Sequence, residues 1–432
     1  MMQLNHSGYI SDSNDNKYAY EFKDGTLIFH FYNAPQLKNV NGIIGKGFDG
    51  HNYFFGTYSF FGFEDLTLFP CEYKLKPDYI VKNYKDNSSF NKASFSFDEL
   101  QYFVPSNLAF KWEGDDFVFS SESKELLAFD VVIDDTTCHV SFDLVSKANG
   151  SLAKIKCETE SVINISFDKT NDYDFLRKIY MTVDNVFAFI CNRRNTTCLS
   201  MHLMGEYPTK GVKNGRVVDK NGQCVSCFYY INQYREKPES KQDIAKAYYS
   251  TKIMDHMDLL FQKVANEVSG VEDDGFSVQC IHPSLERRNL IDLQQSLQIT
   301  SVFEYYVRHF TPPIVTEREH HRKMMELMDG IINDKTNNSK MRDLAKNIKS
   351  HILIAPSLEV KIIKVYNGYD KWDAIGPCIP EKFFPKDDIS KLAKEVNEWR
   401  NELAHCKKGY TPSIDMVLCQ DLVQIKMGDF SS

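Results

Sequence analysis

An arginine and a histidine lie close together near the end of the sequence, in the stretch Arg400-Asn401-Glu402-Leu403-Ala404-His405. Histidine, with an ordinary pKa of about 6.5, can take or give a proton near neutral pH. Arginine stays charged and can bind two phosphate oxygens through parallel N–H bonds. Such a pair suits attack of a ribose 2′-hydroxyl on the adjacent phosphorus, which cuts RNA without a metal ion. In this hypothesis His405 transfers the proton, Arg400 stabilises charge, and Asn401 orients His405 or the RNA.

The pattern predicts that the pair lies on one short helix over residues 388–407. Asp387-Asp388 is a start signal, and Lys407-Lys408-Gly409 is a stop signal. Between them the apolar residues at helical spacing form one core-facing stripe: Leu392, Val396, Trp399 and Leu403. Arg400 and His405 lie about 140° apart around an ideal helix axis, so an isolated helix does not aim both at one phosphate. We therefore expect a facing helix, contributed by a second subunit in a two-fold dimer.

The same spacing also has a purely structural interpretation. In a chain with twelve histidines, about one Arg-x(4–6)-His spacing is expected by chance. In that interpretation Arg400 pairs with a carboxylate from a neighbouring helix, and His405 is solvated near a helix end. Spacing alone leaves both interpretations open.

The stretch 400–405 resembles the Arg-Asn-x-x-x-His signature of HEPN domains, which are small helical bundles that often act as RNases. Residues 290–310 resemble the long first helix of that bundle. A β-rich half containing Tyr53-Phe54-Phe55-Gly56-Thr57, followed by a helical end, resembles the ApeA-like group of bacterial anti-phage proteins. The resemblance implies a homodimeric endoribonuclease of abortive infection that uses no cofactor or metal and responds to a phage-derived trigger. It also implies host or phage RNA as substrate and products that end in a 2′,3′-cyclic phosphate.

Changes in composition along the 432 residues predict an α+β protein of three parts. Residues 1–238 form a sensing or regulatory region of antiparallel strands, with a helix near 171–193. Residues 239–271 form a helical connector, and residues 272–432 form an all-α, HEPN-like helical bundle. The helices of that bundle are expected near 284–310, 315–333, 338–353, 357–368, 388–407 and 412–428.

The net charge of −8 argues against an extended basic face for nucleic acid. Local positive charge near the motif is still predicted to contact RNA, through Lys394, Lys407 and Lys408. No apolar run of about eighteen residues offers a membrane span, and the first residues do not resemble a secretion signal. We therefore expect a cytoplasmic protein with no membrane partner.

Metal binding is not expected at either candidate motif. Cys224 and Cys227 have zinc-ligand spacing, but no second pair completes four ligands. Their surroundings predict a hairpin that turns at Asn221-Gly222, with the two thiols on opposite faces of a strand. Eleven cysteines at irregular spacing indicate reduced thiols that mostly lie in the core. The adjacent pair His320-His321 points in two directions on a helix, unlike a metalloprotease pair.

A rival hypothesis assigns the chain no catalysis. In it, the helical part only dimerises and the β-rich part recognises a protein or another ligand. An intact Arg-Asn-x-x-x-His stretch counts against this alternative.

Overall fold

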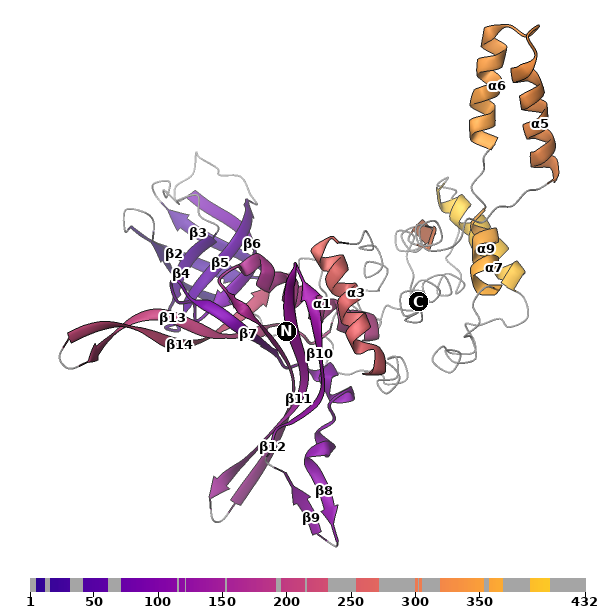
Figure 1. Cartoon of the computed structure of the whole chain (residues 1–432). Helices are drawn as coiled ribbons and strands as arrows, with labels where there is room; N and C mark the ends of the chain where they lie inside the picture. Colours follow the sequence, from indigo (N-terminus) through magenta and orange to yellow (C-terminus); the bar gives the residue numbers. More distant parts are fainter. Residues whose placement is uncertain are drawn as a thin grey trace. The chain divides into compact units, whose positions relative to one another are not determined.

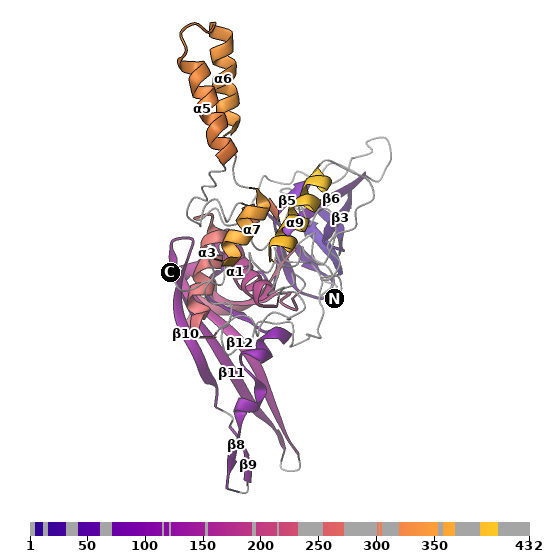
Figure 2. The same cartoon turned by 90° about the vertical axis from the view of Figure 1, so that its right-hand side faces the viewer.

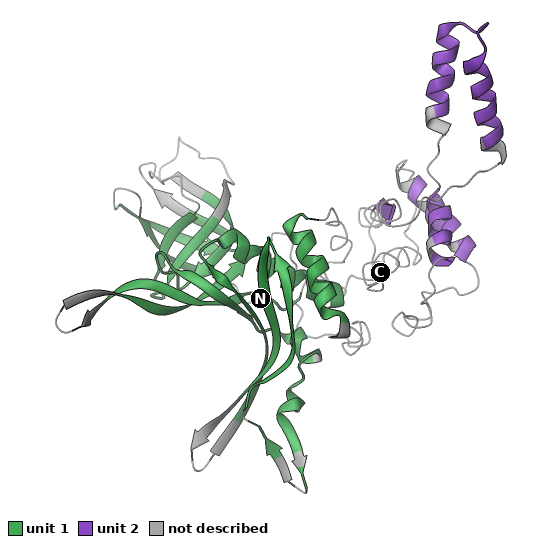
Figure 3. Cartoon of the chain, viewed as in Figure 1, with its two compact units in different colours: residues 1–286 green, residues 287–432 purple. Residues whose placement is uncertain are grey.

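The computed structural model describes the chain over residues 5–11, 16–31, 42–60, 71–114, 116–120, 122–151, 154–191, 196–213, 216–231, 254–271, 300–301, 303–304, 319–352, 357–367 and 389–404. The chain forms two compact units, residues 1–286 and residues 287–432, which are coloured separately in Figure 3. The predicted division at 238 and 271 differs from this boundary, since the first unit includes the segment expected as a connector.

One sheet of twelve antiparallel strands makes up most of the first unit (Figure 1). The strands follow one another in space as β10-β11-β12-β7-β13-β14-β6-β3-β2-β1-β4-β5. Their bounds are β1 (His6–Ser11), β2 (Lys17–Lys23), β3 (Thr26–Phe31), β4 (Gly42–Gly47), β5 (Asn52–Phe60), β6 (Cys71–Lys82), β7 (Ser89–Phe95), β10 (Lys124–Ile133), β11 (Thr136–Ser151), β12 (Lys154–Thr170), β13 (Met201–Lys213) and β14 (Arg216–Tyr230). A separate hairpin pairs β8 (Phe110–Glu113) with β9 (Asp116–Phe119), and short 3-10 turns are η1 (Asp98–Tyr102), η2 (Ser106–Ala109) and η4 (Met254–His256).

The alternation of side chains and the turn residues explain these strands. In β10, Val131 and Ile133 are buried while Val132 between them is exposed, as expected for a strand with one buried face. Asp24 and Gly25 join β2 to β3 with positive φ angles of 50° and 76°. These are the angles of the tight hairpin turn that matches the twist of paired strands.

The first six strands close into a ring because β6 pairs with β3 on one side and with β5 on the other. Large apolar side chains fill this ring, and the buried set comprises Ile10, Tyr20, Phe22, Leu27, Ile43, Tyr53, Phe55, Leu75 and Ile80. Glycine is required where strands approach closely: a Cβ on Gly8 would lie 2.1 Å from the carbonyl oxygen of Lys46.

His6 lies inside this ring. It stacks on Tyr53 with 3.8 Å between ring centroids, and its Nδ1 lies 3.1 Å from the hydroxyl of Tyr20. Its Nε2 is buried without a hydrogen-bond partner among the described residues. Burial lowers the pKa of His6 to about 4, while Asp49 acts to raise it and Lys82 to lower it.

The pKa of His6 predicts a pH-dependent stability for the first unit. Between about pH 6.5 and about pH 4 the unfolded chain binds a proton at His6 that the folded protein does not. Stability from this residue is therefore fully present above pH 6.5 or so, and it is lost as the pH falls toward about 4. We expect His6→Phe, which keeps the stack on Tyr53, to flatten the pH dependence of urea unfolding over this window. If wild type and His6→Phe lose the same free energy of unfolding as the pH falls, a group other than His6 causes the loss. The control is His202→Phe, at an exposed position of β13, which should keep the wild-type pH dependence.

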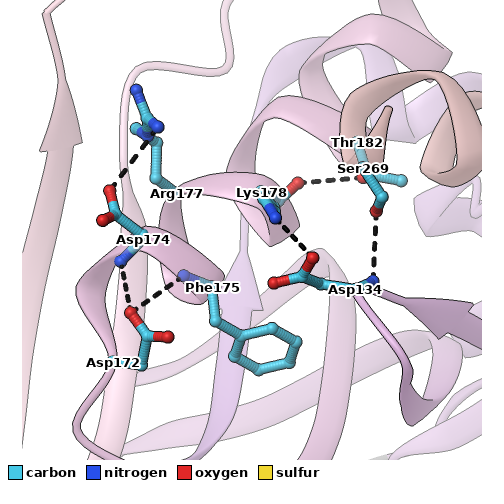
Figure 4. Close-up of polar contacts among 8 residues, drawn as sticks. All are labelled: Asp134, Asp172, Asp174, Phe175, Arg177, Lys178, Thr182 and Ser269. Atoms are coloured by element: carbon cyan, nitrogen blue, oxygen red, sulfur yellow. Dashed lines mark hydrogen bonds and ion pairs between the residues drawn. The ribbon is translucent and has the colours of Figure 1, made fainter. Parts of the chain in front are cut away.

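Helix α1 (Tyr173–Cys191) packs on the sheet with one fully buried face. The residues of that face recur at helical spacing: Leu176, Ile179, Tyr180, Val183 and Phe187. Asp172 caps the helix, since its carboxylate accepts hydrogen bonds from the N–H groups of Asp174 (2.9 Å) and Phe175 (3.3 Å), as Figure 4 shows. The predicted helix near 171–193 is confirmed.

Helix α3 (Met257–Ser269) lies beside α1 and covers β10, the edge strand of the sheet (Figures 1 and 2). The amide of Gln262 accepts from the N–H of Val132 (2.9 Å) and donates to its C=O (3.0 Å), as a neighbouring strand would. The Ser269 hydroxyl accepts from the N–H of Asp134 at 3.1 Å, and Lys178 of α1 pairs with the Asp134 carboxylate (Figure 4). These contacts place α3 in the first unit and satisfy part of an otherwise open edge.

The prediction of an all-α helical bundle at the C-terminal end is wrong. Within the described residues the second unit contains α5 (Glu319–Asn333), α6 (Ser339–Ile352), α7 (Leu358–Asn367) and α9 (Ile389–Ala404). They pack as two pairs, α5 with α6 and α7 with α9. Leu327 on α5 and Leu344 on α6 are each 60% exposed, although a bundle would bury such faces. Helical periodicity located the elements, but it carries no information about which faces meet.

Two further expectations concern the cysteines and the hairpin near them. Strand β13 ends at Lys213 and β14 begins at Arg216, so Asn221-Gly222 lies inside β14 and the predicted turn there is wrong. Cys224 and Cys227 are buried and belong to no disulfide, like Cys138, whereas Cys157 is exposed. In the described stretches, no helix is long and apolar enough to cross a membrane.

Candidate functional site

The motif helix forms as predicted, although its last predicted turn lies outside the described residues. Helix α9 covers residues 389–404, within the expected 388–407. Ala393 and Val396 are fully buried against neighbouring elements, and α7 packs along α9. The small side chain of Ala393 permits this close approach. His405, Lys407 and Lys408 lie beyond the residues that the structure describes.

Arg400 is held in place from two directions. One guanidinium nitrogen donates to the carboxylate of Glu304 at 3.2 Å, and another donates to the side-chain oxygen of Asn401 at 3.3 Å. Glu304 is 96 residues away in the sequence, and like residue 303 it is helical. Arg400 therefore has a carboxylate partner within its own subunit.

Glu304 bridges two cations. Its second oxygen accepts from the ammonium of Lys361 at 3.1 Å, and Lys361 lies on α7 with only 7% of its side chain exposed. A buried ammonium is costly unless it is paired, so this contact compensates for the burial of Lys361. One carboxylate between an arginine and a lysine leaves the cluster with a net positive charge. We call Arg400, Glu304 and Lys361 the Glu304 cluster.

The cluster orients Arg400 without using all of its hydrogen-bonding capacity. A guanidinium has five N–H donors, and the two contacts above engage only two of its nitrogens. The Arg400 side chain is 35% exposed, so solvent or a ligand can reach the remaining donors. A fixed arginine of this kind, in a locally positive setting, suits a phosphate group better than a mobile surface arginine does.

Asn401 and Lys394, the other predicted site residues that the structure describes, lie on the exposed surface of α9, outside the Glu304 cluster. Asn401 is exposed and lies next to Arg400, as expected from its position on the helix. Lys394 is paired with Glu398 one turn later on α9, at 3.9 Å, and both side chains are more than half exposed. A solvent-exposed pair of this kind on a helix face contributes little to stability. Lys394 can therefore replace Glu398 with another anion at little cost.

Two residues of the cluster were not predicted from the sequence. Lys361 follows Leu358 and precedes Ile362 on one helix face, and both of these apolar residues are buried. A lysine inside such an apolar face is a detectable signal, because a buried ammonium requires a carboxylate partner. No sequence signal identifies Glu304 as that partner, since Glu398 and Glu402 are equally available by composition.

Comparisons with known proteins add no family to this geometry. No protein-family model, no curated protein and no solved structure matches the chain. Function is therefore inferred from the residues and contacts of the protein itself.

Proposed function

We propose that the protein is a metal-independent endoribonuclease of bacterial anti-phage defence, of the abortive-infection type. A ribose 2′-hydroxyl attacks the adjacent phosphorus, His405 moves the proton, and Arg400 stabilises the charge that develops on the phosphate oxygens. The observation that carries this proposal is the Glu304 cluster, which holds the Arg400 guanidinium in place. The guanidinium keeps unused N–H donors, and the cluster has a net positive charge. The resemblance of residues 400–405 to the HEPN RNase signature supports the same chemistry.

RNA binding in this proposal depends on local rather than overall charge. Lys394, Lys407 and Lys408 contact the RNA backbone near the motif, and Asn401 orients the substrate or His405. Phosphate contacts of this kind supply affinity without sequence preference. Lys394 exchanges its exposed partner Glu398 for a phosphate at small cost.

The proposed active form is a homodimer through the helical unit. Asn401 is exposed on α9, and the α5–α6 pair exposes large apolar side chains: Met324, Leu327, Met341, Leu344 and Ile348. Exposed apolar side chains of this number on one helix pair are typical of a surface that a partner covers. A second copy of the chain, related by a two-fold axis, would cover the same surface on both subunits.

The first unit acts as a sensor or a restraint in this proposal, and the protein works in the cytoplasm. The support for a separate regulatory role is that residues 1–286 form a compact unit with an apolar core of its own. Recognition of a phage-derived trigger then requires no residue of the nuclease site.

A second candidate function is favoured by the contact between Arg400 and Glu304. An arginine that already has a carboxylate partner is also what a purely structural helix packing would show. In this alternative the helical unit only dimerises, and the first unit recognises a protein or ligand.

Cleavage of RNA by the wild-type protein distinguishes the two functions. We expect total RNA to be cut equally well with and without EDTA, because no step uses a metal. An RNA with 2′-O-methyl groups should resist, because the attacking hydroxyl is blocked, and the products should end in 2′,3′-cyclic phosphates. The reaction is run with and without extract of phage-infected cells. Inhibition by EDTA or equal cutting of 2′-O-methyl RNA contradicts the mechanism, and no cutting in any condition leaves the non-catalytic alternative.

A further inference from the structure

The first unit carries a polar pocket that the proposed cleavage does not use. It has a volume of about 320 Å³ and lies where β5 begins, β6 ends and the β13–β14 hairpin passes. Its lining residues are Gly50, His51, Asn52, Asn83, Tyr84, Lys85, Tyr207, Gln223, Cys224 and Val225. The volume is at the lower end of the range for small-molecule sites, so it suits a ligand of about mononucleotide size.

The walls of this pocket are fixed by packing and backbone contacts. The N–H of Tyr84 donates to the carbonyl of Asn52 at 3.2 Å, and the hydroxyl of Ser226 donates to the carbonyl of Asn83 at 3.1 Å. The ring of Tyr84 stacks on Phe54 with 5.0 Å between centroids. Asn83 has a left-handed φ of 61°, a conformation that asparagine tolerates better than most residues. The pocket is thus formed before any ligand arrives.

Several polar groups of the lining have no partner within the described part of the protein. The side-chain amides of Asn52 and Asn83 make no hydrogen bond there, whereas His51 interacts electrostatically with the neighbouring Asp49 carboxylate. Lys85 has no carboxylate partner there, and its ammonium lies 5.6 Å from the centroid of the Tyr207 ring. Unused donors and acceptors that converge on one cavity indicate a polar ligand.

The charge of the lining selects among polar ligands. Lys85 is the one lysine or arginine of the lining, and no lining residue is a carboxylate. The nearby Glu206 is occupied elsewhere: it accepts from Lys169 at 2.9 Å, from Asn221 at 3.0 Å and from Gln223 at 3.2 Å. An anion is therefore favoured over a neutral sugar, which offers the ammonium of Lys85 hydroxyl acceptors but no opposite charge.

We propose that this pocket binds a nucleoside monophosphate. The phosphate contacts Lys85 and His51, the amides of Asn52 and Asn83 bind the edge of the base, and Tyr84 and Tyr207 provide aromatic surface for its ring. This inference concerns the first unit alone and does not depend on cleavage by the second.

Calorimetric titration of the full chain tests the site with ligands that contain no phosphodiester bond to cut. The probes are AMP, GMP, CMP and UMP, with inorganic phosphate, adenosine and maltose for comparison. We expect at least one monophosphate to bind with Kd below about 1 mM, more tightly than adenosine or phosphate, and maltose not to bind. Lys85→Met should weaken the monophosphate about ten-fold through loss of one charge-assisted contact.

Two further variants assign the contacts. Asn52→Ala should weaken monophosphate binding but leave inorganic phosphate unchanged, because the amide contacts the base. Lys210→Met, at an exposed lysine of β13 outside the lining, should change neither. The inference is overturned if no monophosphate binds, if maltose binds instead, or if Lys85→Met and Lys210→Met have the same effect.

Discussion

RNA cleavage is expected to fall by roughly 10²–10⁴-fold when His405 is replaced by alanine, because general acid–base catalysis contributes about that much. His405→Ala removes the proton-transfer group and leaves the Glu304 cluster intact. The measurement is the rate of cutting of a fluorescent RNA in EDTA. The matched control is His202→Ala, at an exposed histidine of β13 in the other unit, which should cut at the wild-type rate.

Replacement of Arg400 is expected to lower the rate of RNA cleavage to a similar degree, through loss of charge stabilisation rather than of proton transfer. Arg400→Ala should lower cleavage by about 10²–10³-fold, as removal of one charge-stabilising donor does. Arg400→Lys keeps a cation for Glu304 but loses the two-pronged contact with phosphate, so we expect it to fold normally and to remain poorly active. Arg322→Ala, at an arginine of α5 whose side chain is 60% exposed, is the control.

Mixing the two inactive variants tests the shared site. If Arg400 of one subunit works with His405 of the other, a mixed dimer keeps one complete pair. Equal mixing should then restore about a quarter of the wild-type rate, since half of the dimers are mixed and each has one of two sites. Wild-type rates in both single variants would remove the nuclease proposal. If each variant alone loses cleavage and mixing them does not restore it, Arg400 and His405 of the same subunit form the site.

The helical pair α7–α9 is expected to lose about 3–5 kcal/mol of stability when Glu304 is replaced by alanine. The substitution leaves the buried ammonium of Lys361 without its carboxylate and removes the anchor of Arg400. Hydrogen exchange of the amides of α7 and α9 measures this local stability. We expect their protection to fall strongly, while amides of the twelve-stranded sheet stay unchanged.

Glu398→Ala is the matched control for this effect. Glu398 is paired with Lys394 on the surface of α9, so its loss should cost at most about 0.5 kcal/mol. Lys361→Met together with Glu304→Ala should recover part of the stability, because no unpaired ammonium is then left in the buried position. Equal protection in Glu304→Ala and Glu398→Ala would show that the Glu304 cluster is not a stabilising element.

Local pattern alone located many of the elements. The helices at α1, α5, α6, α7 and α9 fall within the predicted ranges, since each has an apolar stripe at helical spacing. The strand-rich character of the first region was also predicted, from alternating aromatic and β-branched residues. The placement of Arg400 and Asn401 on one helix followed from the same periodicity.

Only the tertiary structure decided how these elements associate. It showed that β5 returns to β6 to close a ring, that Asn221-Gly222 lies within a strand, and that the C-terminal helices form pairs rather than the predicted bundle. It also chose Glu304 as the partner of Arg400. A helix or strand is specified by neighbours a few residues away, and these can be read from a sequence. The pairing of Arg400 with a residue 96 positions earlier depends on burial and helix packing across the whole unit, which periodicity does not encode.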